Sequence, residues 1–600
     1  MNNHVLHPRP QLIREDWESL NGQWEFAIDD ADIGSREHWH REPVVFPMSI
    51  EVPFPPESPA SGIGVARVER VWYRRVIDRR PPEDGRRVIL HFTAVDYIAD
   101  VWVNSVHVAH HVGGSVGFSA DITDALAPGD AQTIVVRAFD SSTSLEQPRG
   151  KQDWEEPSHV IWYRRTTGIW REVWWEVAPP ARIQKVAWQP VTASGRLRAD
   201  VSVTGAEPGD SVEITLTHEG DVLARTTLSV ADGYAKGVIE LRDSRLEAEP
   251  ERLQWSPESP TLIDARIRLV RGGGVLDHAE SYVGLRTVGV DNRRFLLNGR
   301  PYPLRLVLEQ AYWPDTHLAA PDADALRREV ELVRELGFNG VRMHQVVADP
   351  RFLYWCDRLG LVVWADSPAS YEFTALSFTR TVQEWQGIVE RDVSHPCVIA
   401  WVPFNESWGV PDLGSDRTQQ EAVRALVHML RALDPSRLVL GNDGWQYVAG
   451  DIVGIHDYSA SARELIARYG SAELMERAVA DGYVGGRRVA LDPGAADVPV
   501  VLSEFGGVSY SRAADTWEGY GVVPDEEAFV DTVAAHFAAA HDSAFAGFCY
   551  TQLTDTLQER NGLLNEAREP KAPIDLLRSI VLDDRQRIQR LRRGIVTAHG

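Results

Sequence analysis

The spacing of apolar and polar residues changes along the chain. Up to about residue 287 short runs place apolar residues at every second position, which is the period of a half-buried β-strand. Such runs are found at 87–92, 99–104, 133–138, 197–203, 211–217 and 264–270. Turns that contain glycine or proline separate them. We predict two β-sandwiches, at 1–180 and 181–287, and the length of the second fits an immunoglobulin-like domain.

After residue 288 the pattern becomes a strand followed by an amphipathic helix, repeated. The clearest helices are Asp322 to Gly337 and Gln419 to Asp434, in which apolar residues recur at intervals of three and four. The predicted strands are 302–308, 339–345, 361–366, 397–404, 438–442, 452–456, 498–504 and 545–551. Eight strands that alternate with helices predict a C-terminal (β/α)₈ (TIM) barrel over 288–600.

Two of these strands end in a glutamate. The fourth leads into Pro403-Phe-Asn-Glu406, and the seventh leads into Ser503-Glu504-Phe-Gly506. A barrel of this kind builds its active site at the C-terminal ends of its strands, so Glu406 and Glu504 are expected on the same rim. Either residue alone could simply be a solvated acid at a strand end. Together they match the two carboxylates of a glycoside hydrolase, which lie about 5–5.5 Å apart in enzymes that retain configuration.

Composition and charge exclude several other classes. The formal net charge is −25, from 62 basic and 87 acidic residues, and it disfavours nucleic acid and anionic membranes as partners. Residues 1–8 contain no basic run followed by an apolar stretch, which predicts a cytoplasmic protein. Cys356, Cys397 and Cys549 are too widely spaced for a disulfide framework or a metal knuckle, so we expect buried, reduced thiols. No cofactor and no metal is expected.

Several motifs resemble glycoside hydrolase family two, which includes β-galactosidases, β-glucuronidases and β-mannosidases. The motifs are Thr167-Gly-Ile-Trp170, Ser394-His-Pro396, Asn405-Glu-Ser-Trp408 and Ser503-Glu-Phe-Gly506. The resemblance covers nearly the whole chain and implies a jelly-roll sugar-binding-like domain, an immunoglobulin-like sandwich and a catalytic barrel. It also implies that Glu406 is the general acid/base and Glu504 the nucleophile.

The resemblance implies further site residues. Arg342 corresponds to an arginine beside the nucleophile, and Asn405 to an asparagine that binds the sugar hydroxyl next to the anomeric carbon. Tyr458 is expected to hydrogen-bond the nucleophile, with a core tyrosine as the alternative. The remaining candidates for substrate contacts are His344, His456, Trp408 and Asp140. For the two histidines the alternative is a structural role, and for Asp140 it is a solvated position in a turn.

Two departures from the family pattern bear on the substrate. Leu308-Glu-Gln-Ala311 stands where related pyranosidases carry Asn-Arg-His-Glu. Glu559-Arg-Asn-Gly562 stands where β-glucuronidases carry an Asn-x-Lys element that holds the substrate carboxylate. A missing cation disfavours an anionic sugar. The sequence therefore predicts a retaining exo-glycosidase for neutral sugars, foremost β-D-galactosides in pyranose or furanose form.

Three alternatives remain. An arabinofuranosidase or a β-glucuronidase would use the same chemistry on another sugar. A catalytically silent carbohydrate-binding protein belongs to a different class, and it would have no need for two carboxylates at the barrel rim. In each case the partner is a carbohydrate, and a homo-oligomer is possible.

Overall fold

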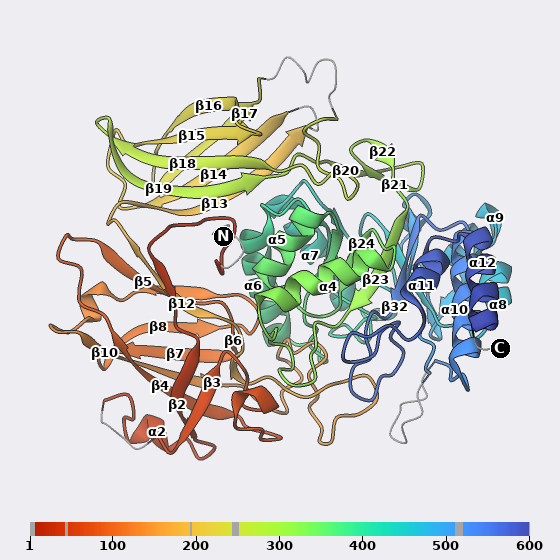
Figure 1. Cartoon of the computed structure of the whole chain (residues 1–600), viewed down its shortest axis with the longest axis horizontal. Helices are drawn as coiled ribbons and strands as arrows, with labels where there is room; N and C mark the ends of the chain where they lie inside the picture. Colours follow the sequence, from red (N-terminus) through yellow and green to blue (C-terminus); the bar gives the residue numbers. More distant parts are fainter. Residues whose placement is uncertain (1–6, 42–45, 193–194, 243–250, 511–519, 599–600) are drawn as a thin grey trace.

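The computed structural model describes residues 7–41, 46–192, 195–242, 251–510 and 520–598. Residues 1–6, part of the stretch on which the cytoplasmic prediction rests, lie outside them. Figure 1 shows two β-sandwiches, one in red to orange and one in yellow to light green, against a barrel in green to blue. None of the helices within the described ranges is long and apolar enough to cross a membrane.

The first sandwich is the expected jelly roll, formed by two antiparallel sheets. One sheet has the order β3 (Met48–Val52), β2 (Gly22–Ile28), β4 (Arg70–Asp78), β10 (Ala131–Phe139), β7 (Ile98–Val103) and β8 (Val106–Val112). The other has the order β1 (Trp17–Ser19), β12 (Val173–Ala178), β5 (Arg87–Phe92) and β9 (Phe118–Asp121). The alternating apolar residues of both sheets meet in one core that includes Trp24, Tyr73 and Trp175.

The second sandwich packs a three-stranded sheet on a four-stranded one. The first contains β13 (Arg182–Thr192), β14 (Arg196–Thr204) and β17 (Tyr234–Glu240). The second has the order β16 (Asp221–Ser229), β15 (Ser211–His218), β18 (Ile263–Arg271) and β19 (Gly274–Val283). Burial alternates regularly along β15 and β18, as the sequence predicts for strands with one face in the core.

The barrel strands are parallel and pair in the order 5-4-3-2-1-8-7-6. In chain order they are β23 (Leu304–Glu309), β24 (Gly340–Met343), β25 (Val362–Asp366), β26 (Val398–Val402), β27 (Leu438–Val439), β28 (Val453–Asp457), β31 (Val500–Gly506) and β32 (Gly547–Thr551). Each overlaps a predicted strand. They are almost entirely buried, because helices cover their outer side and side chains fill the inside.

The barrel helices begin where polar caps are available. Helix α4 (Ala323–Glu335) is preceded by Asp322, whose carboxylate accepts a hydrogen bond from the backbone N of Ala325 at 2.7 Å. Helix α7 (Arg417–Leu433) matches the other helix predicted from periodicity. The further barrel helices include α5 (Pro350–Leu359), α6 (Ala375–Asp392), α8 (Ala462–Tyr469), α10 (Glu526–His541) and α11 (Ile574–Val581). The three cysteines are free and buried, as predicted.

One long connection of the jelly roll reaches the barrel. We call residues 140–167, between β10 and β11 (Gly168–Ile169), the insertion loop. Its backbone binds barrel segments directly, since Arg149 N donates to Ala369 O at 3.0 Å and Tyr371 N donates to Leu145 O at 2.8 Å. A loop this long without regular structure is typically a binding element. It brings side chains of the first domain to the C-terminal ends of the barrel strands.

Candidate active site

Glu406 and Glu504 lie together at the C-terminal rim of the barrel. One carboxylate oxygen of each, with a ring nitrogen of His456, forms a group whose atoms all lie within 4.8 Å of one another. Glu504 is part of β31, whereas Glu406 follows β26 after a short turn. The structure thus brings together the two glutamates that the sequence singled out.

The turn that presents Glu406 has an unusual backbone. Glu406 and Ser407 have φ of 51° and 57°, in the left-handed region that non-glycine residues seldom adopt. Two hydrogen bonds hold this turn: Glu406 N donates to Asp443 O at 2.8 Å, and Ser407 N donates to Asn442 Oδ1 at 2.9 Å. Backbone of this kind is found where the surrounding structure enforces it, often at active sites. The segment after β27 therefore acts as a support for Glu406.

Both oxygens of Glu504 accept hydrogen bonds. Arg342 Nη1 donates to Oε1 at 2.7 Å, and the hydroxyl of Tyr458 donates to Oε2 at 2.5 Å. His344 Nδ1 lies 3.9 Å from Oε1. Glu504 thus accepts hydrogen bonds from a guanidinium and from a hydroxyl. The expected positions of Arg342 and Tyr458 beside Glu504 are observed.

Arg342 is fully buried and surrounded by acids. Besides Glu504 it contacts Asp366 Oδ2 at 2.9 Å and Asp443 Oδ2 at 3.2 Å, and it donates to Asn405 Oδ1 at 2.7 Å. Burial acts to lower the pKa of Arg342, but these carboxylates outweigh burial and raise it well above its usual value. The guanidinium remains charged and fixes Asn405 next to the catalytic pair.

His456 lies between the two glutamates. Its Nδ1 is 2.8 Å from Glu406 Oε1, and its Nε2 is 3.4 Å from Glu504 Oε1. Burial acts to lower the pKa of His456, but the neighbouring carboxylates, with Glu504 first, raise it to about 10. Burial acts to raise the pKa of Glu406, but the hydrogen bond and charge of His456 outweigh burial and lower it. In this state the proton of the pair is on the imidazole.

Trp408 belongs to an aromatic wall beside Glu406. Its ring centroid lies 5.2 Å from that of Tyr371, 5.8 Å from that of Trp162 and 6.0 Å from that of Trp445. Trp162 comes from the insertion loop, and its indole N–H donates to Tyr371 at 2.7 Å. Aromatic faces of this kind can carry the apolar faces of sugar rings.

The structure does not bring Asp140 to the glutamates. Its Oδ1 accepts from Gln147 at 2.6 Å, while its Oδ2 pairs with Arg165 and accepts from Thr167 at 3.3 Å. Asp140 begins the insertion loop, and the buried Arg165 at the other end of that loop neutralises it. Its carboxylate ties the two ends of the loop together, so these contacts give no support to the expectation that it reaches the substrate.

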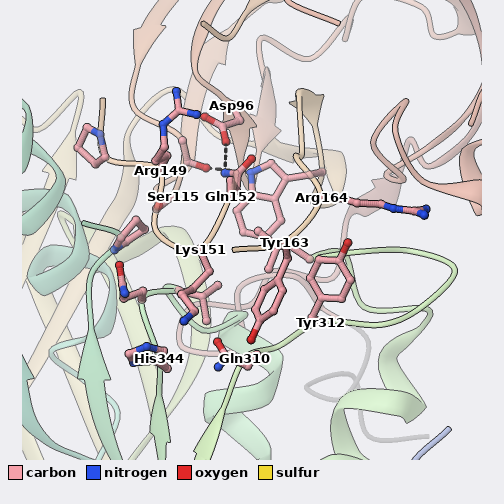
Figure 2. A pocket seen from close by; sticks show the side chains of 17 residues that line it. Asp96, Ser115, Arg149, Lys151, Gln152, Tyr163, Arg164, Gln310, Tyr312 and His344 are labelled. Atoms are coloured by element: carbon pink, nitrogen blue, oxygen red, sulfur yellow. Dashed lines mark hydrogen bonds between the residues drawn. The ribbon is translucent and has the colours of Figure 1, made fainter. Parts of the chain in front are cut away.

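The insertion loop contributes a cation that the motifs did not reveal. Lys151 lines a small cavity together with Tyr163, Gln310 and His344. Figure 2 shows its side chain extending into this cavity, on the side of Gln310 and His344. Over the described part of the chain Lys151 makes no ion pair, and its ammonium lies 5.6 Å from the ring centroid of Tyr163. The unusual length of the loop is the one signal in the sequence that could have indicated it.

Of the two departures from the family pattern, one lines this cavity through Gln310, and the other contacts its lining residue Tyr163 through Glu559. Gln310 Nε2 donates to Gln552 Oε1 at 2.7 Å. The buried Glu559 accepts hydrogen bonds from the Tyr163 hydroxyl and from Asn561 Nδ2. Burial raises the pKa of Glu559, although Lys151 acts to lower it. Arg560 pairs with Glu566 at 3.2 Å, and both side chains are partly exposed.

Three family models match consecutive parts of the chain. They are described as "Glycosyl hydrolases family 2, sugar binding domain" over residues 17–179, "Glycosyl hydrolases family 2" over 181–286 and "Glycosyl hydrolases family 2, TIM barrel domain" over 288–580. The chain belongs to glycoside hydrolase family 2. The resemblance stated from the motifs is confirmed, and with it the three-part fold and the assignment as a glycosidase.

Relatives in family 2 have named activities on two kinds of sugar. A β-glucuronidase of Canis lupus familiaris is 26% identical over 96% of this chain and 92% of its own. A β-glucuronidase of Paenibacillus borealis is 25% identical over 96% of this chain and 98% of its own. A β-galactosidase of Thermoanaerobacter pseudethanolicus is 26% identical over 56% of this chain and 44% of its own. The structure of Bifidobacterium dentium β-glucuronidase with coumarin-3-O-glucuronide superimposes with a TM-score of 0.76 and is 22% identical. The superposition covers 95% of this chain and 98% of the other, which supports the fold.

Proposed function

We propose that this family 2 glycosidase retains configuration through a double displacement, with Glu504 as nucleophile and Glu406 as general acid/base. The spacing of the two side chains carries the proposal, since one oxygen of each belongs to a group of atoms within 4.8 Å. Retaining enzymes place their carboxyl groups about 5–5.5 Å apart, whereas inverting enzymes need about 6.5–9.5 Å to admit a water molecule. The observed spacing is closer to the retaining range than to the inverting one.

The contacts of each glutamate fit these roles. Glu504, held by Arg342 and Tyr458, attacks the anomeric carbon and forms a glycosyl ester while Glu406 protonates the departing oxygen. In the second step Glu406 removes a proton from water, and this water breaks the ester. Asn405, fixed by Arg342, is placed to bind the hydroxyl next to the anomeric carbon, where a hydrogen bond strengthens in the transition state.

Closure by the insertion loop supports action on a terminal sugar. Gln558 Nε2 donates to Trp162 O at 2.7 Å, and Tyr163 donates to Glu559. These bonds join the loop to the last βα connection of the barrel. A sugar chain that continued through this side would have to break them, so the geometry favours a pocket for one terminal residue.

We infer that the terminal sugar carries a carboxylate, as in a β-glucuronide, and that a β-galactoside is the second candidate. The preference for neutral sugars rested on a missing cation, and Lys151 provides one in the cavity. Lys151 lies close enough to Glu559 and Glu406 for its charge to act to lower the pKa of both carboxyls, which places this cation beside the catalytic pair. The names of the relatives that match nearly full-length support a glucuronide. The shorter match to a β-galactosidase supports the second candidate.

A panel of aryl glycosides tests these proposals. We expect hydrolysis of one β-glycoside with NMR detection of the β-anomer as the first product, and kcat/KM highest for the glucuronide. Glu504→Gly should abolish turnover, and added azide should restore release of the aryl group and give the glycosyl azide of inverted configuration. An α-anomer as first product, or full activity of Glu504→Gly, would refute the mechanism. A neutral sugar at the top of the panel would refute only the substrate.

A further inference from the structure

His456 contacts both catalytic carboxylates at once. Its side chain is 1% exposed, with Nδ1 at 2.8 Å from Glu406 Oε1 and Nε2 at 3.4 Å from Glu504 Oε1. The ring packs on the backbone of Gly444, where a Cβ atom would lie 2.3 Å from Nδ1. Gly444 also has φ of 91°, so the chain uses glycine where the imidazole must fit closely. The ring is therefore held in a built position between the two acids.

Charged groups face His456 from four other segments of the barrel. They are Glu406 after β26, Asp443 after β27, Glu504 on β31, Arg342 on β24, and the titratable His344 directly after β24. Three of these five are carboxylates, and Asp443 Oδ2 lies 3.8 Å from Nε2. Arg342 opposes a charge on the ring, whereas the pKa of His344 is lowered well below its usual value, foremost by burial, so His344 adds little opposing charge. The surplus of carboxylates favours the imidazolium, in agreement with a pKa of about 10 for His456.

This arrangement conflicts with the first step of the reaction. A general acid must hold a proton when the glycosidic bond breaks, but across this 2.8 Å contact the pKa of His456 is raised and that of Glu406 is lowered, which favours the proton on the imidazole. The proton therefore has to reach Glu406 before or during bond cleavage. The imidazole at 2.8 Å is the donor in place to supply it.

Resting on the proposed function, we propose that His456 stores the proton that Glu406 delivers to the leaving group. In the Michaelis complex the Nδ1–H bond of His456 breaks and an O–H bond forms on Glu406 Oε1. Glu406 then passes this proton to the glycosidic oxygen as Glu504 forms the ester. In the second step Glu406 takes a proton from water and returns it to Nδ1. One proton leaves with the alcohol, one comes from water, and His456 ends as it began.

The charge of Glu504 links the protonation of His456 to the formation and cleavage of the glycosyl ester. The negative charge of Glu504 is the first of the carboxylate contributions that keep His456 protonated. Attack on the anomeric carbon turns that carboxylate into a neutral ester, which removes this stabilisation. His456 consequently stays neutral throughout the glycosyl-enzyme stage. Its Nδ1 can then accept a proton from Glu406 only when the ester has been cleaved and Glu504 is charged again.

The test is the His456→Asn variant, whose side-chain amide keeps a hydrogen-bond donor near Glu406 but cannot supply a proton. With dinitrophenyl glycosides, which leave without protonation, we expect kcat/KM within about threefold of the wild type. With an alkyl or unactivated phenyl glycoside we expect a loss of at least tenfold, in line with the typical contribution of a general acid. The alkaline limb of kcat/KM for the poor leaving group should move to lower pH by at least one unit.

Tyr458→Phe is the matched control, because it removes a contact of Glu504 rather than of Glu406. It should slow good and poor leaving groups alike and leave the alkaline limb in place. Equal losses for both leaving groups in His456→Asn, with an unshifted limb, would overturn the proton-storing role. Such a result would leave the double displacement intact, since Glu504→Gly and azide test that step separately. Thermal unfolding of both variants checks the fold.

Discussion

Arg342 on the second barrel strand lies 2.7 Å from Glu504 on the seventh and also pairs with Asp366 and Asp443. One guanidinium thus compensates three buried carboxylates. Removing one partner of a buried ion pair typically costs about 3–5 kcal/mol, because the other charge is left unpaired.

Arg342→Gln should therefore lower both stability and turnover. We expect the free energy of unfolding to fall by roughly 3 kcal/mol and kcat/KM to fall by about 100-fold or more. Urea denaturation and aryl glycoside hydrolysis measure the two effects. Arg560→Gln is the control, because its pair with Glu566 lies near the surface and should be worth under about 1 kcal/mol. A fully stable and active Arg342→Gln would contradict the central role of this residue.

Glu406→Ala should separate the two chemical steps. Substrates with very good leaving groups should still form the glycosyl-enzyme rapidly, and hydrolysis should then stall because no base activates water. Stopped-flow kinetics should show a burst of aryl alcohol followed by slow turnover. Azide, which needs no base, should accelerate release and give a product of retained configuration, unlike the product from Glu504→Gly. Absence of a burst with every leaving group would argue against the acid/base assignment.

Lys151→Met should change the choice of sugar more than the rate on all sugars. A hydrogen bond to a charged group contributes about 1.5–3 kcal/mol, so kcat/KM for an aryl glucuronide should drop roughly 10- to 100-fold. The aryl galactoside should change by less than about threefold, since it has no carboxylate to lose a partner. Arg560→Ala serves as the control and should leave the ratio unchanged. If Arg560→Ala changed the glucuronide-to-galactoside ratio of kcat/KM and Lys151→Met did not, Arg560 rather than Lys151 would be the cation that binds the substrate.

Glu384 should make the stability of the protein depend on pH. This glutamate of α6 accepts a hydrogen bond from Gly114 N of the jelly roll at 2.8 Å, and burial raises its pKa from 4.5 to about 7. The folded state therefore holds a proton that the unfolded state releases from pH 4.5 upward, and stability falls as pH rises from about 4.5 to 7. At about 1.4 kcal/mol per unit, this amounts to roughly 3 kcal/mol.

Glu384→Gln cannot titrate, so it should remove this fall. Between pH 5 and pH 8 the free energy of unfolding, measured by urea denaturation, should fall by roughly 3 kcal/mol more in the wild type than in the variant. Glu390→Gln, which changes an exposed glutamate of the same helix, is the matched control. Parallel stability profiles for Glu384→Gln and the wild type would show that Glu384 does not carry the effect.

The sequence predicted the framework of the site better than its details. The barrel strands are buried on both sides, so each appears as an apolar run, and Glu406 and Glu504 follow from the rule that strand ends face the active site. Strand β27 ends at Val439, short of the predicted 442, and Asn442 and Asp443 beyond it support the turn of Glu406.

Side chains placed by long loops could not be predicted in this way. Lys151 reaches the cavity, and Asp140 does not, because of how the insertion loop closes on Arg165 and on the barrel. Residue spacing carries no information on that closure. His456 was a candidate for sugar contacts, but its position between two carboxylates depends on three-dimensional distances between β28, β26 and β31.

In the proposed function the insertion loop divides sugar recognition and bond cleavage between two domains of the chain. The catalytic carboxylates belong to the barrel, whereas Lys151, Trp162 and Tyr163 belong to a connection of the jelly roll. Exchanging that connection between relatives would alter which sugar is accepted while every reacting group stays in place. The isolated barrel would keep the reacting groups but lose one wall of the pocket. In this proposal the jelly roll determines which sugar binds, and the barrel carries out the same reaction on it.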